Sequence, residues 1–286
     1  MSPPCGIIKY LTSLQELQIS LAGEADKSKG QFVKDLANLC ELRVLKVFIV
    51  SMDERLRLDL LESLGNLHKL QHLELQHGYI ELPSFIDDLS ILQNLSSLHL
   101  DVRGLGDQGL QILDEMPNLC YLELHDSNGR ATITGTANQG YFKKLRSRRL
   151  KRSMIQFVVN EDSGVSFTMW DSKISDNYPA AIDSKMKQDS STRARTVMPN
   201  LEALSFQVVG SIMACNNGSL DNLGLECLAS LQKVTVSLYP GGAPGDVVQN
   251  QKAALRHAIQ DHPNRPTLQF KYESHYYEVA NQVMMI

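Results

Sequence analysis

Residues 67–75 read LHKLQHLEL and residues 92–100 read LQNLSSLHL. Both stretches have apolar residues at their first, fourth, seventh and ninth positions, which gives the pattern L-x-x-L-x-x-L-x-L. If Ile, Val, Met or Phe is also allowed, the complete pattern occurs five more times. The other copies begin at Leu11, Leu39, Met116, Met198 and Leu228. Successive copies begin 24 to 30 residues apart, except for one long gap before Met198. A repeat near this length is typical of a solenoid.

The end of each copy predicts a short β-strand. Alternate side chains of a strand point to opposite faces, so Leu73 and Leu75 should point into a core and Glu74 away from it. One repeat cannot bury its leucines alone, and its stability must come from stacking on its neighbours. The sequence therefore predicts an α/β fold, a leucine-rich-repeat solenoid. A curved parallel sheet should form its concave side, with irregular loops and short helices on the convex side.

A strongly basic segment, KKLRSRRLKR at 143–152, keeps the phase of the repeat. Phe142, Leu145 and Leu150 match apolar positions of an eighth copy, but Arg148 stands where a buried leucine belongs. A buried charge without a partner is strongly destabilising. We therefore expect the Arg148 guanidinium either to reach solvent or to meet an acidic group.

Three interpretations of this basic patch remain open. It could contact a protein or dock within the molecule, it could be a solvated repeat edge, or it could serve nucleic-acid binding or nuclear import. Short basic runs often match such motifs by chance. The whole chain carries a net charge of −4, which disfavours a general nucleic-acid binder. The residues of the patch are Lys143, Lys144, Arg146, Arg148, Lys151 and Arg152.

The repeats divide the chain into two parts. We expect residues 1–240 to form an array of about eight irregular repeats, interrupted at about 160–197 by a polar insertion too long for an ordinary loop. Within the insertion, SFTMW at 166–170 is compatible with a short strand or an unanchored loop. Residues 241–286 should form a helical cap and a tail. The cap helix should lie within 246–263, with Asp246 as its N-cap.

The residue between the last two apolar positions of each copy should face outward from the concave sheet. This row mixes charges and changes from acidic to basic between the fifth and sixth repeats, as on a surface that recognises another protein. A merely solvated face is the alternative. The row consists of Gln18, Lys46, Glu74, His99, Glu123, Arg149, Ser205 and Thr235.

Motifs of catalysis do not occur in the sequence: it has no phosphate-binding loop, no nucleophile elbow and no H-E-x-x-H pair. We therefore expect no catalytic, metal-binding or cofactor-binding residue, and a protein that is not an enzyme. The five cysteines form no C-x-x-C pair, which favours a reducing compartment. No apolar stretch has the length of a signal-peptide core or a membrane span. We expect a cytoplasmic location, with the nucleus as alternative, and no membrane partner.

Two segments carry a resemblance to a known family. LPSFIDDLSILQNLSSLHL at 82–100 and ALRHAIQDHPNRPTLQF at 254–270, with the irregular repeats and the polar insertion, resemble the C-terminal domain of grass nucleotide-binding leucine-rich-repeat disease-resistance proteins. The resemblance implies a protein-recognition domain of plant innate immunity. Such domains restrain the nucleotide-binding switch and help to sense pathogen effectors.

By the same resemblance, the expected partners are a pathogen effector, a guarded host protein or the upstream receptor modules. Those modules lie outside this sequence, so nucleotide binding is not carried over. The asparagine that follows the strand in standard leucine-rich repeats is mostly missing here. A general intracellular leucine-rich-repeat scaffold is the second hypothesis, and nucleic-acid binding or nuclear import through the basic patch is the third.

Overall fold

The computed structural model describes the strands of the repeat array and much of the chain that connects them. The described residues are 10–21, 27–49, 54–77, 91–102, 106–126, 130–134, 142–150, 153–160, 164–171, 198–209, 223–239 and 243–272. The segment 81–90, which includes the beginning of the family-like stretch, lies outside these residues.

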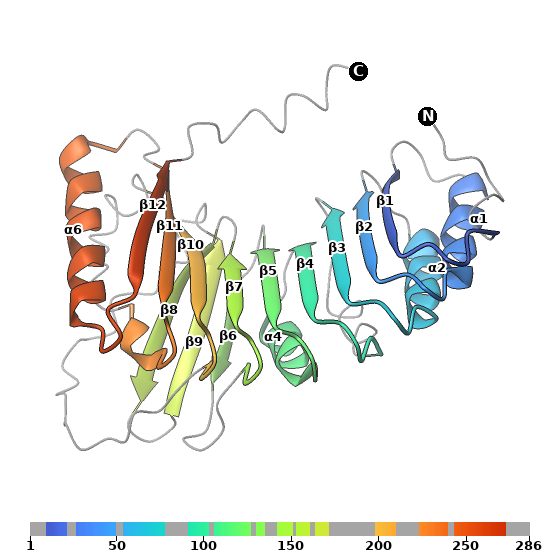
Figure 1. Cartoon of the computed structure of the whole chain (residues 1–286). Helices are drawn as coiled ribbons and strands as arrows, with labels where there is room; N and C mark the ends of the chain where they lie inside the picture. Colours follow the sequence, from blue (N-terminus) through green and yellow to red (C-terminus); the bar gives the residue numbers. More distant parts are fainter. Residues whose placement is uncertain are drawn as a thin grey trace.

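A nine-stranded parallel sheet runs through the whole molecule, and its strands follow one another along an arc (Figure 1). The order is β1-β2-β3-β4-β5-β7-β10-β11-β12, so every strand pairs with the strands of adjacent repeats. This architecture confirms the predicted leucine-rich-repeat solenoid. The strands are β1 (Glu16–Leu21), β2 (Val44–Ile49), β3 (His72–His77), β4 (Ser97–Val102), β5 (Tyr121–Asp126), β7 (Ser147–Leu150), β10 (Ala203–Val209), β11 (Lys233–Tyr239) and β12 (Thr267–Tyr272).

The four apolar positions of the repeat form one continuous core. In the third repeat, Leu67, Leu70, Leu73 and Leu75 each expose 1% of their surface or less. The first repeat is less protected, because Leu14, Leu17 and Ile19 are only partly buried. Removing a leucine side chain from water contributes about 1.5–3 kcal/mol, so the stacked leucines dominate the stability of the array.

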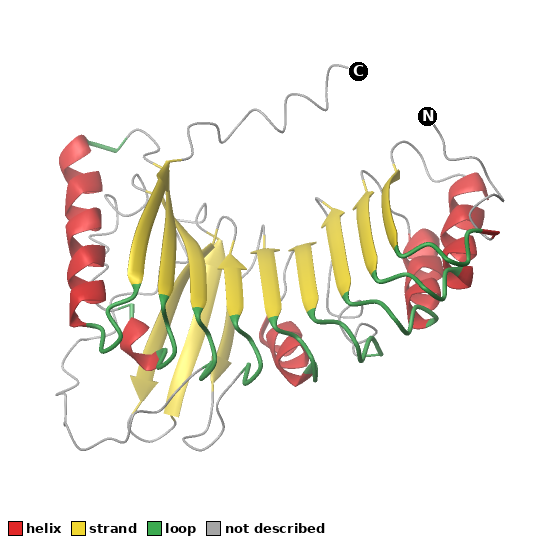
Figure 2. Cartoon of the chain, viewed as in Figure 1, coloured by secondary structure: helices red, strands yellow, loops and turns green. Residues whose placement is uncertain are grey.

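Helices lie on the side of the sheet to which the leucines point (Figure 2). Helices α1 and α2 pack against each other, and the Ser63 hydroxyl of α2 donates a hydrogen bond of 2.8 Å to the Val33 carbonyl of α1. Apolar residues recur at helical spacing around residues 60–70, and the helix there ends at Gly65. The α-helices are α1 (Lys27–Asp35), α2 (Glu54–Gly65), α4 (Gly106–Glu115) and α6 (Gly245–Asp261), and the short 3-10 helices are η2 (Leu36–Asn38) and η4 (Leu225–Cys227).

The C-terminal segment contains both the expected helix and a further strand. Helix α6 begins directly after Pro244, which occupies the N-cap position without a side-chain hydrogen bond. The prediction of Asp246 as N-cap was therefore wrong, since Asp246 lies inside the first turn. After α6, β12 pairs in parallel with β11 and extends the sheet. The proposed division of the chain at residue 240 stays a prediction.

A second, antiparallel sheet of three strands accompanies the later repeats. Its order is β6-β9-β8, and β9 contains the SFTMW segment, which the sequence left open between strand and loop. Strand β6 lies beside α4, and β8 lies beside β10, so this sheet occupies the convex layer where earlier repeats have helices (Figure 1). Its strands are β6 (Arg130–Thr134), β8 (Ser153–Asn160) and β9 (Gly164–Asp171).

Side-chain amides connect successive repeats at a position that the sequence analysis did not use. This position directly precedes the second apolar residue of the repeat, and its side chain donates to a backbone carbonyl of the preceding repeat. Four asparagines and one serine do so: Asn94 to His68 at 2.6 Å, Asn118 to Gln93 at 2.7 Å, Asn200 to Lys143, Ser230 to Pro199 at 2.5 Å, and Asn264 to Ala229. This asparagine ladder supplies inter-repeat bonds in a protein that lacks most of the asparagines expected after its strands.

Candidate functional site

The structure aligns the predicted outward residues into one row across the sheet. Neighbouring members are register partners at each strand pairing, from β1 to β11. This middle row comprises Gln18, Lys46, Glu74, His99, Glu123, Arg149, Ser205 and Thr235. It continues on β12 with Gln269, the partner of Thr235, which the sequence analysis missed. The signal was available, because HPNR at 262–265 repeats the MPNL of two earlier repeats and precedes an alternating L-x-F.

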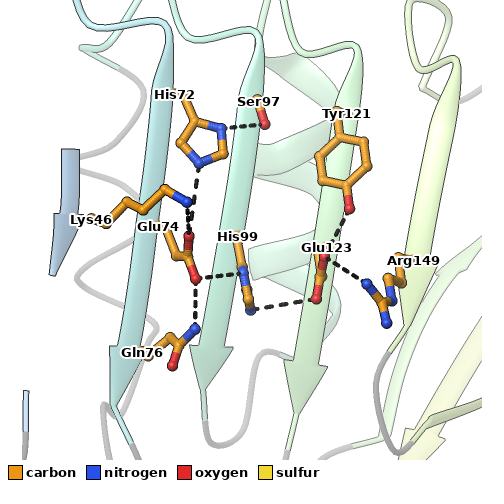
Figure 3. A network of polar contacts seen from close by, with 9 residues as sticks. All are labelled: Lys46, His72, Glu74, Gln76, Ser97, His99, Tyr121, Glu123 and Arg149. Carbon is orange, nitrogen blue, oxygen red and sulfur yellow. Dashed lines mark hydrogen bonds and ion pairs between the residues drawn. The ribbon is translucent and has the colours of Figure 1, made fainter. Parts of the chain in front are cut away.

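The centre of the middle row is a series of polar contacts that joins residues of β2, β3, β4, β5 and β7 (Figure 3). Lys46 Nζ lies 3.2 Å from Glu74 Oε2, and Glu74 Oε1 lies 3.3 Å from His99 Nδ1. On the other side of the imidazole, His99 Nε2 lies 3.7 Å from Glu123 Oε1. Arg149 Nη1 completes the series at 3.8 Å from Glu123 Oε2. Parallel strands are about 4.8 Å apart, which is the spacing that lets side chains of adjacent repeats meet in this way.

The two carboxylates receive further hydrogen bonds from their own strands. Gln76 Nε2 donates to Glu74 Oε1 at 2.6 Å, and the Tyr121 hydroxyl donates to Glu123 Oε2 at 2.7 Å. Both donors lie two residues from their acceptor, so the strand places them on the same face. The network therefore fixes the directions of both acidic side chains.

The network also changes the acidity of its members. Burial tends to raise the pKa of Glu74, but hydrogen bonds from Lys46 and Gln76 and the charge of His99 outweigh burial and lower it. Burial and the charge of Lys46 lower the pKa of His72. Burial and the hydrogen bond to Glu123 raise the pKa of Tyr121 to about 12. An ionised Glu74 and a neutral Tyr121 are thus the stable arrangement near neutral pH.

His99 joins the Lys46–Glu74 part of the network to the Glu123–Arg149 part. A neutral imidazole carries one N–H, whereas an imidazolium carries two. Nδ1 of His99 lies 3.3 Å from Glu74, whereas the 3.7 Å between Nε2 and Glu123 is too long for a hydrogen bond, so a protonated ring would be attracted to both carboxylates but would donate to Glu74.

Exposure differs between the ends and the centre of the network. The side chains of Lys46 and Arg149 are each 43% exposed, whereas that of Glu123 is 7% exposed. Both cations are therefore accessible to a partner, while the acids form the floor between them. Buried and ordered charges of this kind favour recognition over a solvated surface, since a partner group can replace one member of an existing pair.

Side chains two residues away on the strands extend this polar surface beyond the middle row. The ring of His72 pairs through Nδ1 with the Ser97 hydroxyl at 2.8 Å, and His125 Nδ1 lies 2.8 Å from Asp101 Oδ1. The sequence analysis did not single out Ser97, Asp101 or Gln76. Their position two residues from the middle row would have identified them.

Among the described residues of β10, β11 and β12, the outward side chains form no comparable network of ion pairs. Ser205 and Thr235 are short and uncharged, and Gln207 and Ser237 two residues further along their strands are buried. The charged outward side chains there are Lys233 and Lys271, both exposed.

The predicted basic patch is distributed over different environments. Lys143, Lys144 and Arg146 are exposed at the turn that leads into β7, and Arg149 belongs to the middle row. Lys151 and Arg152 lie outside the described residues. The inclusion of Arg148 in a surface patch was wrong, because this residue is 1% exposed.

Arg148 is the largest fully buried side chain among the described residues. Its guanidinium lies over the Phe142 ring, 5.0 Å from the centroid, and Nη1 is 3.9 Å from Met198 Sδ. Burial lowers its pKa to about 9, and the negative charge of Asp114 opposes that effect. The expected escape to solvent does not occur. Asp114 of α4 acts on the guanidinium through its charge, and its carboxylate accepts a hydrogen bond from the Phe142 amide.

In the part of the chain that the structure describes, no three His, Cys, Asp or Glu side chains come together in a way that would hold a metal ion. Within the same residues, no helix is long and apolar enough to cross a membrane.

Comparison with known protein families finds a match. A family model described as "Leucine-rich repeat region" matches residues 2–81 and 77–268, which together cover most of the chain. No curated protein matches the chain.

Proposed function

Because this chain belongs to the leucine-rich repeat region family, whose domains generally mediate protein–protein interaction, we propose that its concave face recognises proteins within an intracellular plant immune receptor. The observation that carries the proposal is the middle row, whose members stand in register on nine adjacent strands. An extended, ordered polar surface of this kind suits a binding role rather than a catalytic one.

The immune role rests on the resemblance of residues 82–100 and 254–270 to grass disease-resistance proteins. It makes three classes of partner reasonable: a pathogen effector, a guarded host protein, and the coiled-coil and nucleotide-binding modules of the receptor. We place the protein in the cytoplasm, with the nucleus as alternative, and a fluorescent fusion in leaf cells would distinguish the two.

A pull-down with the upstream modules and candidate effectors tests the proposal. The informative variant is Glu74→Ala/Glu123→Ala/Arg149→Ala, which removes both acids and one accessible cation of the network. The matched control is Glu62→Ala, on the exposed side of α2. We expect the triple variant to lose its partner while the control keeps it. Equal capture by both variants would place the interaction elsewhere on the molecule.

A general scaffold is the second candidate, and the same family membership supports it. Transcript levels and disease phenotypes after infection separate it from the immune role, because a scaffold without an immune role should show no change in either.

Nucleic-acid binding through the basic patch is the third candidate, and the exposure of Lys143, Lys144 and Arg146 keeps it testable. Filter binding across a salt titration tests it. A dissociation constant below micromolar at physiological salt, with loss of binding when these three residues are replaced, would support it.

A further inference from the structure

The concave face separates its charges by sign along the solenoid. Three outward rows define this face: the middle row, and the residues two positions before and two positions after it on each strand. On β1 to β5 these rows contain four acids and one lysine, together with three histidines. The acids are Glu16, Glu74, Asp101 and Glu123, and the lysine is Lys46.

On β7, β10, β11 and β12 the sign is reversed. The described outward positions of these strands contain no acid and three cations, namely Arg149, Lys233 and Lys271. Lys233 and Lys271 are exposed, and their register partners are the uncharged Thr267 and Ser237. The change of sign falls between β5 and β7, where Glu123 and Arg149 face each other.

The separation is confined to the three rows. Directly before the strands, the exposed Arg43 lies in the acidic half and the exposed Glu202 lies in the basic half. The sign of the concave face is therefore not a consequence of the composition of each half. It follows from which residues occupy the outward strand positions.

We propose that the concave face takes one extended protein segment in a fixed direction, with basic residues over β1–β5 and acidic residues over β10–β12. Because the two halves carry opposite charges, a segment bound in this direction gains affinity from attraction at both ends. In the reverse direction like charges would face each other, and the affinity would be lower. The inference rests on the proposed recognition function and names the chemistry of its partner. Nine strands at about 4.8 Å span roughly 38 Å, which an extended segment covers with about 12 residues.

Two peptides of about 14 residues and identical composition test the direction. In the first, four lysines occupy one end and four glutamates the other, separated by Ser and Gly. In the second, lysines and glutamates alternate. Fluorescence anisotropy with the full chain should give about tenfold tighter binding for the first peptide at low salt, and the difference should shrink at high salt because ions screen exposed charges.

A photo-cross-linker at either end of the first peptide shows the direction in which the bound peptide lies along the sheet. We expect the lysine end to label β1–β5 and the glutamate end to label β10–β12. Equal affinities, reversed labels, or no binding of either peptide at about 1 mM would each overturn the proposal.

Charge reversal provides the matched control. The variant Lys271→Glu should weaken the preference for the first peptide, whereas Arg43→Glu, which changes the net charge equally but lies outside the three rows, should retain it. An equal loss in both variants would show a response to net charge alone and would contradict the proposal. If the pull-down detects partners that depend on Glu74, Glu123 and Arg149 but cross-linking shows no order, the recognition function stands and only the direction fails.

Discussion

The first five strands and the last four strands of the parallel sheet have different structural elements packed beside them. Strands β1 to β5 accompany helices α1, α2 and α4, and carry a cross-linked polar network on their outward face (Figures 1 and 3). Strands β7, β10, β11 and β12 accompany an antiparallel sheet, and β7 brings an arginine into the core. Nevertheless, the register passes from Glu123 through Arg149 to Ser205 without a shift.

The difference shows which part of a repeat is constrained. The two apolar positions of the strand and the two positions before it determine how one repeat stacks on the next. The convex layer can change from helix to sheet, and the outward row can change in charge, because neither contributes the main stacking contacts. The outward residues, which determine what the concave face can bind, can therefore vary from repeat to repeat while the stacking of the parallel strands stays the same.

Replacing matched core leucines should produce the largest effect and tests whether both halves stack equally. Leu98 and Leu204 occupy the same repeat position and expose 0% and 1% of their surface. Truncating a core leucine costs about 2–5 kcal/mol, and an introduced aspartate adds an unpaired buried charge. We expect Leu98→Asp and Leu204→Asp each to abolish cooperative unfolding in urea followed by circular dichroism.

The control for this experiment is Leu58→Asp, since Leu58 on α2 is 52% exposed. It should keep a cooperative transition. If Leu204→Asp were as mild as the control, the C-terminal strands would not share the core of the N-terminal ones.

Restoring an apolar residue at position 148 should have the next largest effect, with the opposite sign. The native environment lowers the pKa of Arg148 to about 9 from 12.5, so folding disfavours the protonated form. That penalty is present below about pH 9 and decreases as the pH rises towards the unfolded value. Arg148→Leu removes it, and replacing a buried charge by an apolar side chain often stabilises by about 1–4 kcal/mol.

Urea unfolding at pH 7 measures the change, and Arg149→Leu, one residue further and on the opposite face, is the matched variant. We expect stabilisation only at position 148. A lower midpoint for Arg148→Leu would mean that its contacts with Phe142 and Met198 and the charge of Asp114 outweigh the cost of burial, and that the irregular repeat has been adapted to its arginine.

The sequence was sufficient to predict the parallel ladder and much of its surface. The spacing of apolar residues is local and repeats at every strand, so the fold, the phase of residues 142–150 and the middle row could all be read from it. The same spacing carries no information about what covers a repeat. Helices α1 and α4 and the strands β6 and β8 were missed for that reason, since β6 pairs with β9 more than thirty residues away in the chain.

The environment of Arg148 could not be derived from its own repeat. Solvent escape and burial both satisfy the local pattern, and the groups around the buried guanidinium include Met198 and the charge of Asp114, which lie in other parts of the sequence. The central network was likewise only partly predictable. Alternation placed Glu74, His99 and Glu123 outward, but their mutual distances depend on the register and curvature of the folded sheet.

The asparagine ladder should contribute a smaller effect that both halves share. Asn118 in the first half and Asn200 in the second each donate a side-chain hydrogen bond to the preceding repeat. A protein hydrogen bond contributes about 0.5–1.5 kcal/mol net. We expect Asn118→Ala and Asn200→Ala to reduce the free energy of unfolding by similar amounts in this range.

Asn66 provides the control, because its side chain bonds to Glu62 within the same repeat. Asn66→Ala should affect hydrogen exchange of α2 alone, whereas the ladder variants should increase exchange in two adjacent repeats. Identical exchange patterns for all three variants would show that the ladder does not couple repeats.

Acid titration of the network should produce the smallest effect and should be confined to the first half. Glu74 has a pKa below its usual value in the folded protein, because its hydrogen bonds and neighbouring charges outweigh burial. A carboxyl group of this kind stabilises the fold above its unfolded pKa, and the contribution is lost as the pH falls through the folded pKa. Stability measured from pH 6 to pH 3 should therefore fall less steeply in Glu74→Gln than in the native protein. Glu202→Gln, exposed in the second half and outside the network, should leave the slope unchanged; if it flattened the slope as much as Glu74→Gln, the acid sensitivity would come from overall charge and the two halves would not differ electrostatically.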